Sequence, residues 1–435
     1  MEPFYIALAT VGFLFGYLIL GVWVFVAITM VGLSALYLLL DFPLDRIGSI
    51  LRSTMWKSAA SYELASVPLF ILMGELIFRT NISDKLFRGL TPWVNHIPGR
   101  LLHCNIGGCT LFAAISGSST ATTATVGKIT LAELQARGYD RNLAVGSLAG
   151  AGSLGLLIPP SISMIIYGIL SETSIAHLFA AGLLPGLLIA ALFSAYIGAR
   201  ALMSDTVVRE PRRHYALRQY LWSFVELLPI LSLLVIVMGG IYSGIVTPSE
   251  AAALGVAAAL LVSGVGGQLN RRMIVEALVS ASRTSCMVLS ILVAAAFMSS
   301  AIAFAHVPQE TARLIAAMNL GPVSLILLIG VFYIIVGMFL DGLSIMVMTL
   351  PITLPLILSA GWDPVWFGVF LVITIELGLV TPPVGFNLFV LQGMTGLPIG
   401  RIARAAFPFF LLMVVAALII IAVPDIALWL PRALF

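Results

Sequence analysis

Charged residues are scarce in this sequence. Asp, Glu, Lys and Arg together make up 9% of its 435 residues, whereas 60% are hydrophobic. Soluble globular proteins carry roughly 25% charged residues, so the composition excludes an ordinary soluble domain. The formal net charge of +3 is too small to indicate a nucleic-acid partner. We therefore interpret the few Arg and Lys residues as marks of membrane topology.

Cysteine is also scarce, and several enzyme motifs are missing. The three cysteines, Cys104, Cys109 and Cys286, lie in apolar segments and indicate no disulfide framework. HCNIGGC at 103–109 falls short of the four ligands of a structural zinc site. The glycines of GAGSLG at 150–155 follow no strand, so they do not indicate a dinucleotide site, and no GxxxxGK[ST] motif occurs. Without a catalytic cluster or a Gly-x-Ser-x-Gly elbow, an intramembrane enzyme is disfavoured.

Long apolar stretches are abundant instead. Stretches of about 20 residues, enough to cross a hydrocarbon core of roughly 30 Å, recur along the whole chain. The first one opens with an acidic residue and is longer than the apolar region of a signal peptide, so we expect no cleavable signal. The sequence predicts an all-α polytopic membrane protein with about ten transmembrane helices and two re-entrant hairpins.

The chain contains an internal repeat. The proline pair at 159–160 recurs at 382–383, an offset of 223 residues, and the same offset carries Gly155 onto Gly378. GSLGLLIPPS therefore has a twin, ELGLVTPPVG, at 376–385. One ungapped register that links several landmarks indicates a duplication, the usual origin of transporter halves.

The charges of matching loops indicate that the two repeats are inverted. RGYDR at 137–141 is basic, but its partner at 360–364 has no Lys or Arg. Conversely, the loop at 171–177 lacks basic residues while its partner at 395–404 has two Arg. By the positive-inside rule, matching loops lie on opposite sides of the membrane.

This repeat predicts a domain organisation. Residues 1–64 would hold the first spans and an interfacial amphipathic helix at 41–64, unless the first spans are miscounted. Repeat 1 would occupy 65–200, a cytoplasmic loop and central spans 201–273, and repeat 2 274–435. The predicted hairpins are 102–134 and 324–358, with tips at 116–124 and 339–345, and the predicted broken helices are 141–170 and 364–391.

A helix broken within the membrane has a chemical use. A broken helix is tolerated only where it is buried in protein or lines a cavity. Gly and Pro leave backbone carbonyls without helical partners, and such carbonyls suit a hard cation such as Na⁺. The hydroxyls of Ser118, Ser119 and Thr120 in the first tip would complete the shell. The alternative for this Ser/Thr run is helix packing by small residues.

Carboxylates occur at the equivalent places of the second repeat. The offset of 223 brings Asp341 to the second tip and Glu376 to the second broken helix. Intramembrane carboxylates are costly and are functional candidates by default. The alternative is that each one only holds the break in shape. Glu75 and Glu226 fit interhelical pairing or interfaces better.

Five segments in combination resemble the large membrane subunit of tripartite ATP-independent periplasmic (TRAP) transporters. They are GSSTATTATVGKI at 117–129, GSLGLLIPPS, VTPSEAAA at 246–253, FLDG at 339–342 and GLVTPPVGFNL at 378–388. The first tip is also similar to the hairpin of divalent anion:sodium symporters, although Ser119 stands where those proteins have Asn.

The resemblance implies an elevator mechanism, with a scaffold domain and a moving transport domain. It implies Na⁺-driven uptake, with two or more ions, of a C4-dicarboxylate, a sialic acid or another carboxylate. The implied partners are a separate small four-helix membrane subunit, a periplasmic substrate-binding protein and the lipid bilayer of the bacterial inner membrane. The alternative is a sodium-coupled anion symporter that needs no binding protein.

The resemblance and the residue chemistry together give a predicted site. Asn387 lies one turn beyond the second break, and Thr381 either caps the half-helix or joins a cation site. The predicted cation ligands are Ser118, Ser119, Ser153, Gly155, Ile158, Asp341, Gly342, Glu376, Gly378 and Thr381. The predicted substrate contacts are Ser119, Thr120, Ser161, Asp341 and Asn387.

Overall fold

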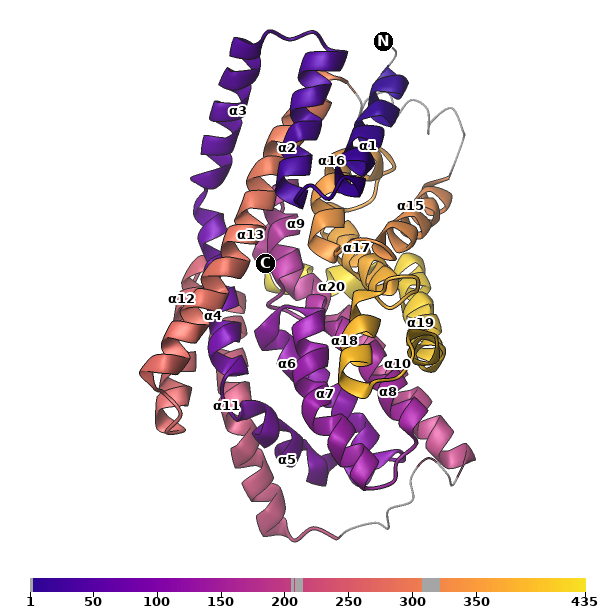
Figure 1. Ribbon diagram of the computed structural model, residues 1–435. Helices are drawn as coiled ribbons and strands as arrows, with labels where there is room; N and C mark the ends of the chain where they lie inside the picture. The colour runs from indigo at the N-terminus through magenta and orange to yellow at the C-terminus, as the bar shows by residue number, and fades with distance from the viewer. Residues whose placement is uncertain (1–2, 205–206, 208–213, 307–320) are drawn as a thin grey trace.

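The computed structural model describes residues 3–204, 207, 214–306 and 321–435, and every regular element in these ranges is a helix (Figure 1). The elements that precede the first hairpin are α1 (Pro3–Ile19), α2 (Val24–Ser34) with a π-helical end (Ala35–Leu39), α3 (Leu44–Ala59), a 3₁₀ turn (Tyr62–Ala65), α4 (Ser66–Phe78), α5 (Ile82–Val94) and a 3₁₀ turn (Arg100–Leu102). Among the described residues, three helices precede the second hairpin directly, α11 (Leu217–Tyr242), α12 (Pro248–Val265) and α13 (Arg271–Phe304), and the predicted repeat boundaries at 65–200 and 274–435 stay a prediction.

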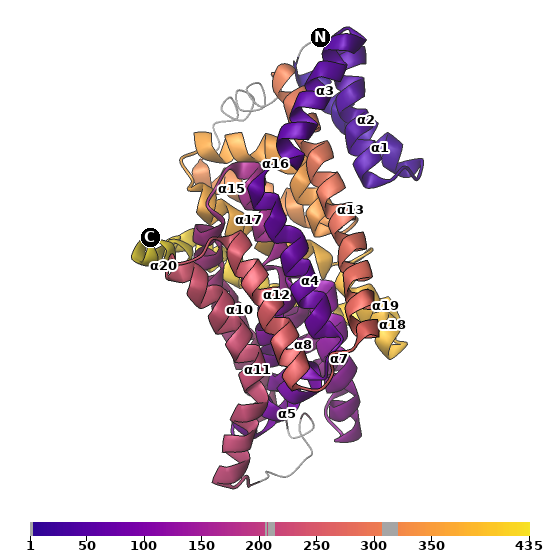
Figure 2. The same ribbon diagram turned by 90° about the vertical axis from the view of Figure 1, so that its left-hand side faces the viewer.

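Helices α1–α5 and α11–α13 pack next to one another, and we call them the scaffold group. Helix α13 has 34 residues, which at 1.5 Å per residue makes it about 50 Å long. It packs against α2, α3 and α4, while α12 packs against α4 and α11, and α11 against α5. Figure 2 shows α4, α12 and α13 side by side on one flank of the molecule.

The first repeat consists of a helical hairpin, a broken helix and a long helix. Hairpin 1 is α6 (His103–Ser116) and α7 (Ser119–Ala136). Broken helix 1 is α8 (Arg141–Gly152), a 3₁₀ turn (Ser153–Leu156) and α9 (Ile162–Ser171), and α10 (Ile175–Met203) follows it. Gly117 turns the hairpin with φ of 57°, a conformation that glycine adopts without strain.

The second repeat has the same elements in the same order. Hairpin 2 is α15 (Pro322–Gly337) and α16 (Gly342–Ser359). Broken helix 2 is α17 (Pro364–Leu379) and α18 (Phe386–Thr395), and α19 (Ile399–Ala422) and α20 (Asp425–Leu434) complete the chain. In both broken helices the bond within the proline pair is cis.

The two broken helices run antiparallel. Arg141 at the start of α8 donates to the carbonyl of Thr395 at the end of α18, at 3.1 Å. Tyr167 in α9 donates to the carbonyl of Pro364 at the start of α17, at 2.6 Å. Each broken helix therefore begins where the other ends, as inverted repeats require.

Each hairpin packs against the other repeat. Helix α7 of hairpin 1 contacts α18, and α16 of hairpin 2 contacts α9. These contacts between the repeats bring the two hairpin tips toward the middle of the molecule, with hairpin 1 below and hairpin 2 above in the view of Figure 1.

Glycines make these crossings close. A Cβ atom added to Gly155 would lie 2.7 Å from the carbonyl oxygen of Ser118 in the tip of hairpin 1. A Cβ added to Gly378 would lie 2.6 Å from the Cα of Gly337 in hairpin 2. Contacts under 3.0 Å leave no room for a side chain, so both twin glycines are required for packing against a hairpin.

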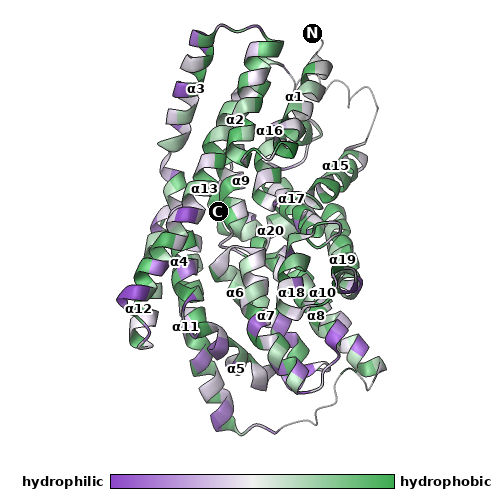
Figure 3. Cartoon of the chain, in the orientation of Figure 1, coloured by the Kyte–Doolittle hydropathy of each residue, from purple (hydrophilic) through white to green (hydrophobic). Residues whose placement is uncertain are grey.

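The chain is an all-α polytopic membrane protein. Six helices of the described residues are long and apolar enough to cross a membrane alone, and the pair Leu44–Ala59 and Tyr62–Phe78, bent by 55°, makes a seventh. Four further apolar helices are shorter: Val24–Leu39, Ile162–Ser171, Pro322–Gly337 and Pro364–Leu379. The last three belong to the hairpins and broken helices of the two repeats. Figure 3 shows hydrophobic colour through the middle of the molecule and hydrophilic colour toward the lower ends of α5 and α11. The total of about ten spans stays a prediction.

The predicted amphipathic helix is present as α3. Ile47 is its one buried residue, and Trp56 is 76% exposed. The helix lies along α13 and is joined to α4 through the 55° bend. Its placement at the membrane surface stays a prediction.

Candidate functional site

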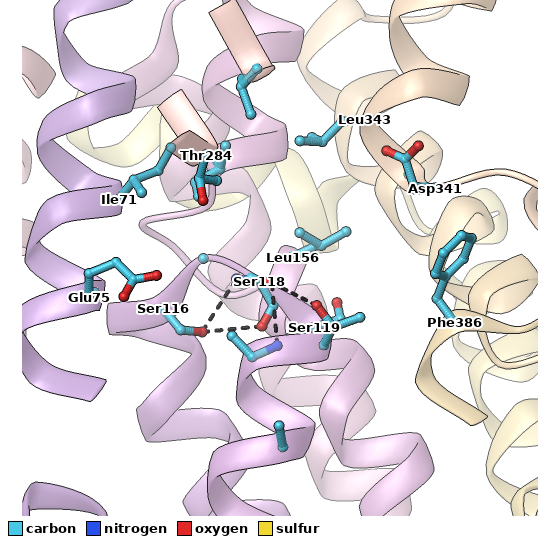
Figure 4. Close-up of a pocket in the computed structure, with 18 of the residues that line it drawn as sticks. Ile71, Glu75, Ser116, Ser118, Ser119, Leu156, Thr284, Asp341, Leu343 and Phe386 are labelled. Atoms are coloured by element: carbon cyan, nitrogen blue, oxygen red, sulfur yellow. Dashed lines mark hydrogen bonds between the residues drawn. The ribbon is translucent and has the colours of Figure 1, made fainter. Parts of the chain in front are cut away.

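A cavity of about 470 Å³ lies where the hairpin tips face the scaffold group. Its walls come from α4 and α13 on one side and from the tips of hairpins 1 and 2 on the other (Figure 4). Small-molecule sites have volumes of roughly 300–1,000 Å³, so the cavity has a suitable size. The predicted residues that line it are Ser118, Ser119, Thr120, Asp341 and Gly342.

The tip of hairpin 1 carries a network of hydroxyl groups. Ser118 caps α7 by accepting a hydrogen bond from the Ala121 amide at 3.4 Å, and its Oγ lies 3.2 Å from the Thr120 hydroxyl. Behind it, the hydroxyls of Ser116 and Thr122 are 2.6 Å apart. A hydroxyl both donates and accepts, so this network can turn its oxygen atoms toward a cation or its O–H groups toward an anion.

A buried carboxylate joins hairpin 1 to broken helix 2. Ser119, in the first turn of α7, donates its hydroxyl to Oε1 of Glu376 in α17. Glu376 is 1% exposed, and its Oε2 has no hydrogen-bond partner among the described residues. An unsatisfied buried polar group costs about 1–3 kcal/mol. This oxygen therefore fits a cation or a proton as its missing partner.

Asp341 faces the cavity from the tip of hairpin 2. Its Oδ2 accepts a hydrogen bond from the Ser344 amide at 3.1 Å and so caps α16. The residue is only partly buried and lines the cavity together with Gly342 (Figure 4). The cap uses one lone pair of Oδ2, so the other lone pairs of the carboxylate remain available for a ligand.

Three predicted hydroxyl ligands are turned away from the cavity. Ser153 donates to the carbonyl of Gly150 at 2.5 Å and contacts the sulfur of Met413 at 3.2 Å. Ser161 caps α9 and donates to the carbonyl of Leu156. Thr381 donates to the carbonyl of Leu377 at 2.6 Å. Each hydroxyl thus satisfies the backbone around a break.

The predicted backbone ligands lie behind the tips. Gly155 touches Ser118, and Gly378 touches hairpin 2, as described above. Ile158 is 3% exposed, and its side chain packs closely against Gly186 of α10. These residues do not line the cavity, but the first two bring broken-helix backbone directly against hairpin backbone.

Asn387 is fully buried in the first turn of α18. Neither its amide nitrogen nor its oxygen has a hydrogen-bond partner among the described residues. It does not line the cavity, and its contact with substrate stays a prediction. Its unpaired oxygen and the free oxygen of Glu376 are two orphan acceptors of the second repeat.

Sequence reasoning missed the scaffold side of the cavity. Glu75 of α4 lines the cavity and pairs with Arg79, whose guanidinium also donates to Ser280 of α13 at 2.7 Å. Thr284 of α13 lines it as well. An acidic residue within an apolar run was a signal for Glu75, but no sequence pattern shows which face of α4 lies opposite the hairpins. Glu226 does pair between helices, with Arg88 at 3.0 Å.

The electrostatics of the cavity are unusual for an anion site. No Lys, Arg or His is among its lining residues, which include the carboxylates Glu75 and Asp341. The N-terminal ends of α7 and α16 face it, and such ends carry partial positive charge and free N–H groups. An anion here would be held by helix ends, hydroxyls and any accompanying cations.

Comparison with known proteins identifies similar chains. A family model described as "Tripartite ATP-independent periplasmic transporter, DctM component" matches residues 11–426. The C4-dicarboxylate TRAP transporter large permease protein DctM of Pseudomonas aeruginosa is 34% identical over 92% of this chain and 93% of its own length. The ectoine/5-hydroxyectoine TRAP transporter large permease protein UehC of Ruegeria pomeroyi is 34% identical, over 84% of this chain and 85% of its own.

A solved structure has a similar fold. The crystal structure of the YdaH transporter of Alcanivorax borkumensis aligns with a TM-score of 0.62, covering 90% of this chain and 89% of that one. Only 14% of residues are identical, so this likeness concerns the fold.

Proposed function

Because the chain belongs to the DctM component family of the tripartite ATP-independent periplasmic transporters, we propose that it is the large permease subunit that moves a carboxylate substrate across the bacterial inner membrane, driven by Na⁺. The observation that carries this proposal is the cavity between the two hairpin tips. Asp341 and Ser119 line this cavity, and Ser119 donates a hydrogen bond to the buried carboxylate of Glu376. The family membership makes the chain a transport protein. The ion, the cargo and the mechanism are proposed.

Two cation sites are proposed, one behind each tip. Site 1 comprises Ser118 and Ser119 with the backbone around Gly155, because this backbone touches the tip directly. Site 2 comprises Asp341 and Gly342 with the backbone of Gly378 to Thr381. Na⁺ prefers oxygen ligands of these kinds, and half-helix ends supply them in transporters. Glu376 adds a buried oxygen that has no other partner among the described residues.

The substrate is proposed to sit in the cavity between Thr120 and Asp341. Its carboxylate would accept hydrogen bonds from the N-terminal ends of α7 and α16 and from the tip hydroxyls. Bound Na⁺ would supply the positive charge that the lining side chains lack. This arrangement makes substrate binding depend on Na⁺, which is the coupling that a symporter needs. Two relatives, a C4-dicarboxylate permease and an ectoine/5-hydroxyectoine permease, support a small carboxylate as the substrate.

We propose an elevator movement between two groups of helices. The hairpins, the broken helices, α10 and α19 form one set of packed helices, and α4, α11, α12 and α13 form a second. The two sets meet where α4 and α11 contact α6 and where α13 contacts α16. The cavity lies between the two groups, so sliding one group along the other would carry the cavity across the membrane. In this mechanism the scaffold group stays fixed.

The proposed partners are a separate small membrane subunit and a periplasmic binding protein. The family description, a component of a tripartite periplasmic transporter, supports such an assembly, and the binding protein would choose among carboxylates. A symporter that works without a binding protein is the competing possibility, and the same assay tests both.

The test is uptake by proteoliposomes that contain the chain, its small subunit and its binding protein. We expect accumulation of the carboxylate carried by that binding protein only under an inward Na⁺ gradient, with no accumulation when K⁺ replaces Na⁺. Accumulation that ignores the Na⁺ gradient would refute the coupling. Accumulation that is unchanged when the binding protein is omitted would favour the symporter.

A further inference from the structure

A second pocket lies at the base of hairpin 1, away from the proposed transport cavity. It has a volume of about 350 Å³ and is formed by α7, the start of α8 and the end of α18. In Figure 1 the connection between α7 and α8 lies at the same end of the molecule as α5. The basic loop at 137–141 belongs to this end, which the positive-inside rule assigns to the cytoplasm.

Two cationic side chains line this pocket. Lys128 of α7 is exposed and has no hydrogen-bond or ion-pair partner among the described residues. Arg141 at the start of α8 is also exposed, and the one hydrogen bond that its side chain makes to a described residue is to the Thr395 carbonyl. A guanidinium has five N–H donors, so Arg141 retains most of its capacity for an anion.

The acidic groups near the pocket are already engaged. Glu133 pairs with Arg137 at 3.1 Å. Asp140 caps α8 by accepting from the Leu143 amide at 2.6 Å. A third cation, Arg401 of α19, donates to the Asn142 side chain at 3.4 Å, next to the pocket. The local balance of charge is therefore positive.

The remaining walls are mostly apolar and reach the outer surface. They include Leu131, Ala132 and Val145, and Met394, which is 36% exposed on α18. On the same helix Phe389 is 47% exposed. Two cationic side chains beside exposed apolar residues fit a ligand that has an anionic headgroup and an apolar body.

We propose that this pocket binds the phosphate group of an anionic phospholipid from the cytoplasmic leaflet, held by Lys128 and Arg141. Basic pockets between transmembrane helices on the cytoplasmic side favour such headgroups. Free phosphate offers the same anionic chemistry but does not use the apolar walls. A bound lipid would join α7 of hairpin 1 to the start of α8 and the end of α18, and the Arg141 hydrogen bond already links these last two elements.

The experiment measures phosphatidylglycerol binding to the purified full chain by native mass spectrometry, with phosphatidylcholine as the neutral comparison. We expect one phosphatidylglycerol to be retained, and Lys128→Gln and Arg141→Gln each to weaken its binding roughly fivefold. Lys57→Gln, an exposed lysine on α3, is the matched control and should leave binding unchanged.

Inorganic phosphate distinguishes the two sources of the anion. Millimolar phosphate should not displace the lipid, because it gains nothing from the apolar walls. Displacement by phosphate alone would overturn the lipid assignment. Equal retention of phosphatidylglycerol by the wild-type chain, Lys128→Gln and Arg141→Gln would overturn the site itself. The readout is independent of transport, so it stands or fails separately from the proposed function.

Discussion

At the scale of single residues, twin positions of the repeat have taken different chemistry. Ser153 and Glu376 occupy equivalent places in the two broken helices. Ser153 satisfies its own helix, whereas Glu376 reaches across to Ser119 of the other repeat. The two proposed cation sites are therefore unequal, because only one broken helix contributes a carboxylate.

Glu376→Gln tests the buried carboxylate. The amide keeps an oxygen that can accept from Ser119, so we expect normal expression and folding. Loss of the negative charge should raise the Na⁺ concentration for half-maximal uptake at least tenfold, equivalent to about 1.4 kcal/mol. A Na⁺ titration of uptake measures it. Glu226→Gln is the control. It breaks an ion pair with the 60% exposed Arg88 and should change the Na⁺ dependence of uptake little. An unaltered Na⁺ titration in Glu376→Gln would show that Glu376 has a structural role only.

Asp341→Asn separates capping from cation binding. Asn caps a helix about as well as Asp, so α16 should remain intact. Removing the charge should lower the steepness of the Na⁺ dependence, since one of two sites is weakened. Asp363→Asn is a close control, because Asp363 caps α17 at 2.7 and 3.2 Å but does not line the cavity. The same steepness in both variants would exclude Asp341 as a ligand.

At the scale of elements, the glycines of the broken helices have a packing role that the sequence did not reveal. Their position next to proline pairs predicted exposed backbone for ions. The structure shows that Gly155 and Gly378 also make direct contact with the hairpins. Close packing and cation binding are compatible, because a glycine that lets the hairpin backbone approach also brings the backbone dipoles of hairpin and broken helix together.

Gly155→Ala should therefore destabilise the fold. The new methyl would meet backbone of Ser118 at 2.7 Å, and overpacking of this kind costs about 1–3 kcal/mol. Thermal unfolding of the purified chain should show a lowered midpoint. Gly393→Ala in α18, where nothing lies within 4 Å, should be neutral or slightly stabilising because Ala favours the helix. Equal midpoints for the two variants would contradict the close contact.

Hairpin 2 has a buried polar network that should stabilise it. The Tyr333 hydroxyl of α15 lies 2.7 Å from the hydroxyls of both Thr349 and Thr353 of α16. Tyr333→Phe should reduce the free energy of unfolding by about 1 kcal/mol, because both threonines keep backbone partners. Chemical or thermal unfolding measures the loss. Tyr37→Phe, at a 50% exposed position, is the comparison and should have no effect.

At the scale of the whole molecule, the repeat made much of the fold predictable. The predicted hairpin at 102–134 corresponds to His103–Ser116 and Ser119–Ala136. The first broken helix ends at Ser171 rather than at 170, and the second ends at Thr395 rather than at 391. Periodicity and offset reveal where elements begin and end. They do not reveal how a helix is rotated or what faces it across space. For this reason Ser161, a predicted substrate contact, is found bonded to the Leu156 carbonyl and not in the cavity lining, and the place of Glu75 in the cavity was missed.

The elevator proposal predicts that the hairpin tip changes sides. With the native cysteines at 104, 109 and 286 replaced by alanine, Thr120→Cys should react with an impermeant maleimide from either face of the membrane. Addition of Na⁺ and substrate should raise the rate of labelling from one face and lower the rate from the other. Ser243→Cys, exposed between α11 and α12 of the scaffold group, should react from one face under all conditions. Labelling of Thr120→Cys from one face alone would contradict the movement.

The hydrogen bond between Ser119 and Glu376 also has a consequence for biosynthesis. Its partners are 257 residues apart in the sequence. A ribosome adds about 5–20 residues per second, so hairpin 1 waits on the order of ten to fifty seconds before α17 emerges. During this time its hydroxyl-rich tip has no native partner from the second repeat. The transport core can therefore close only late in translation, after α17 has joined hairpin 1.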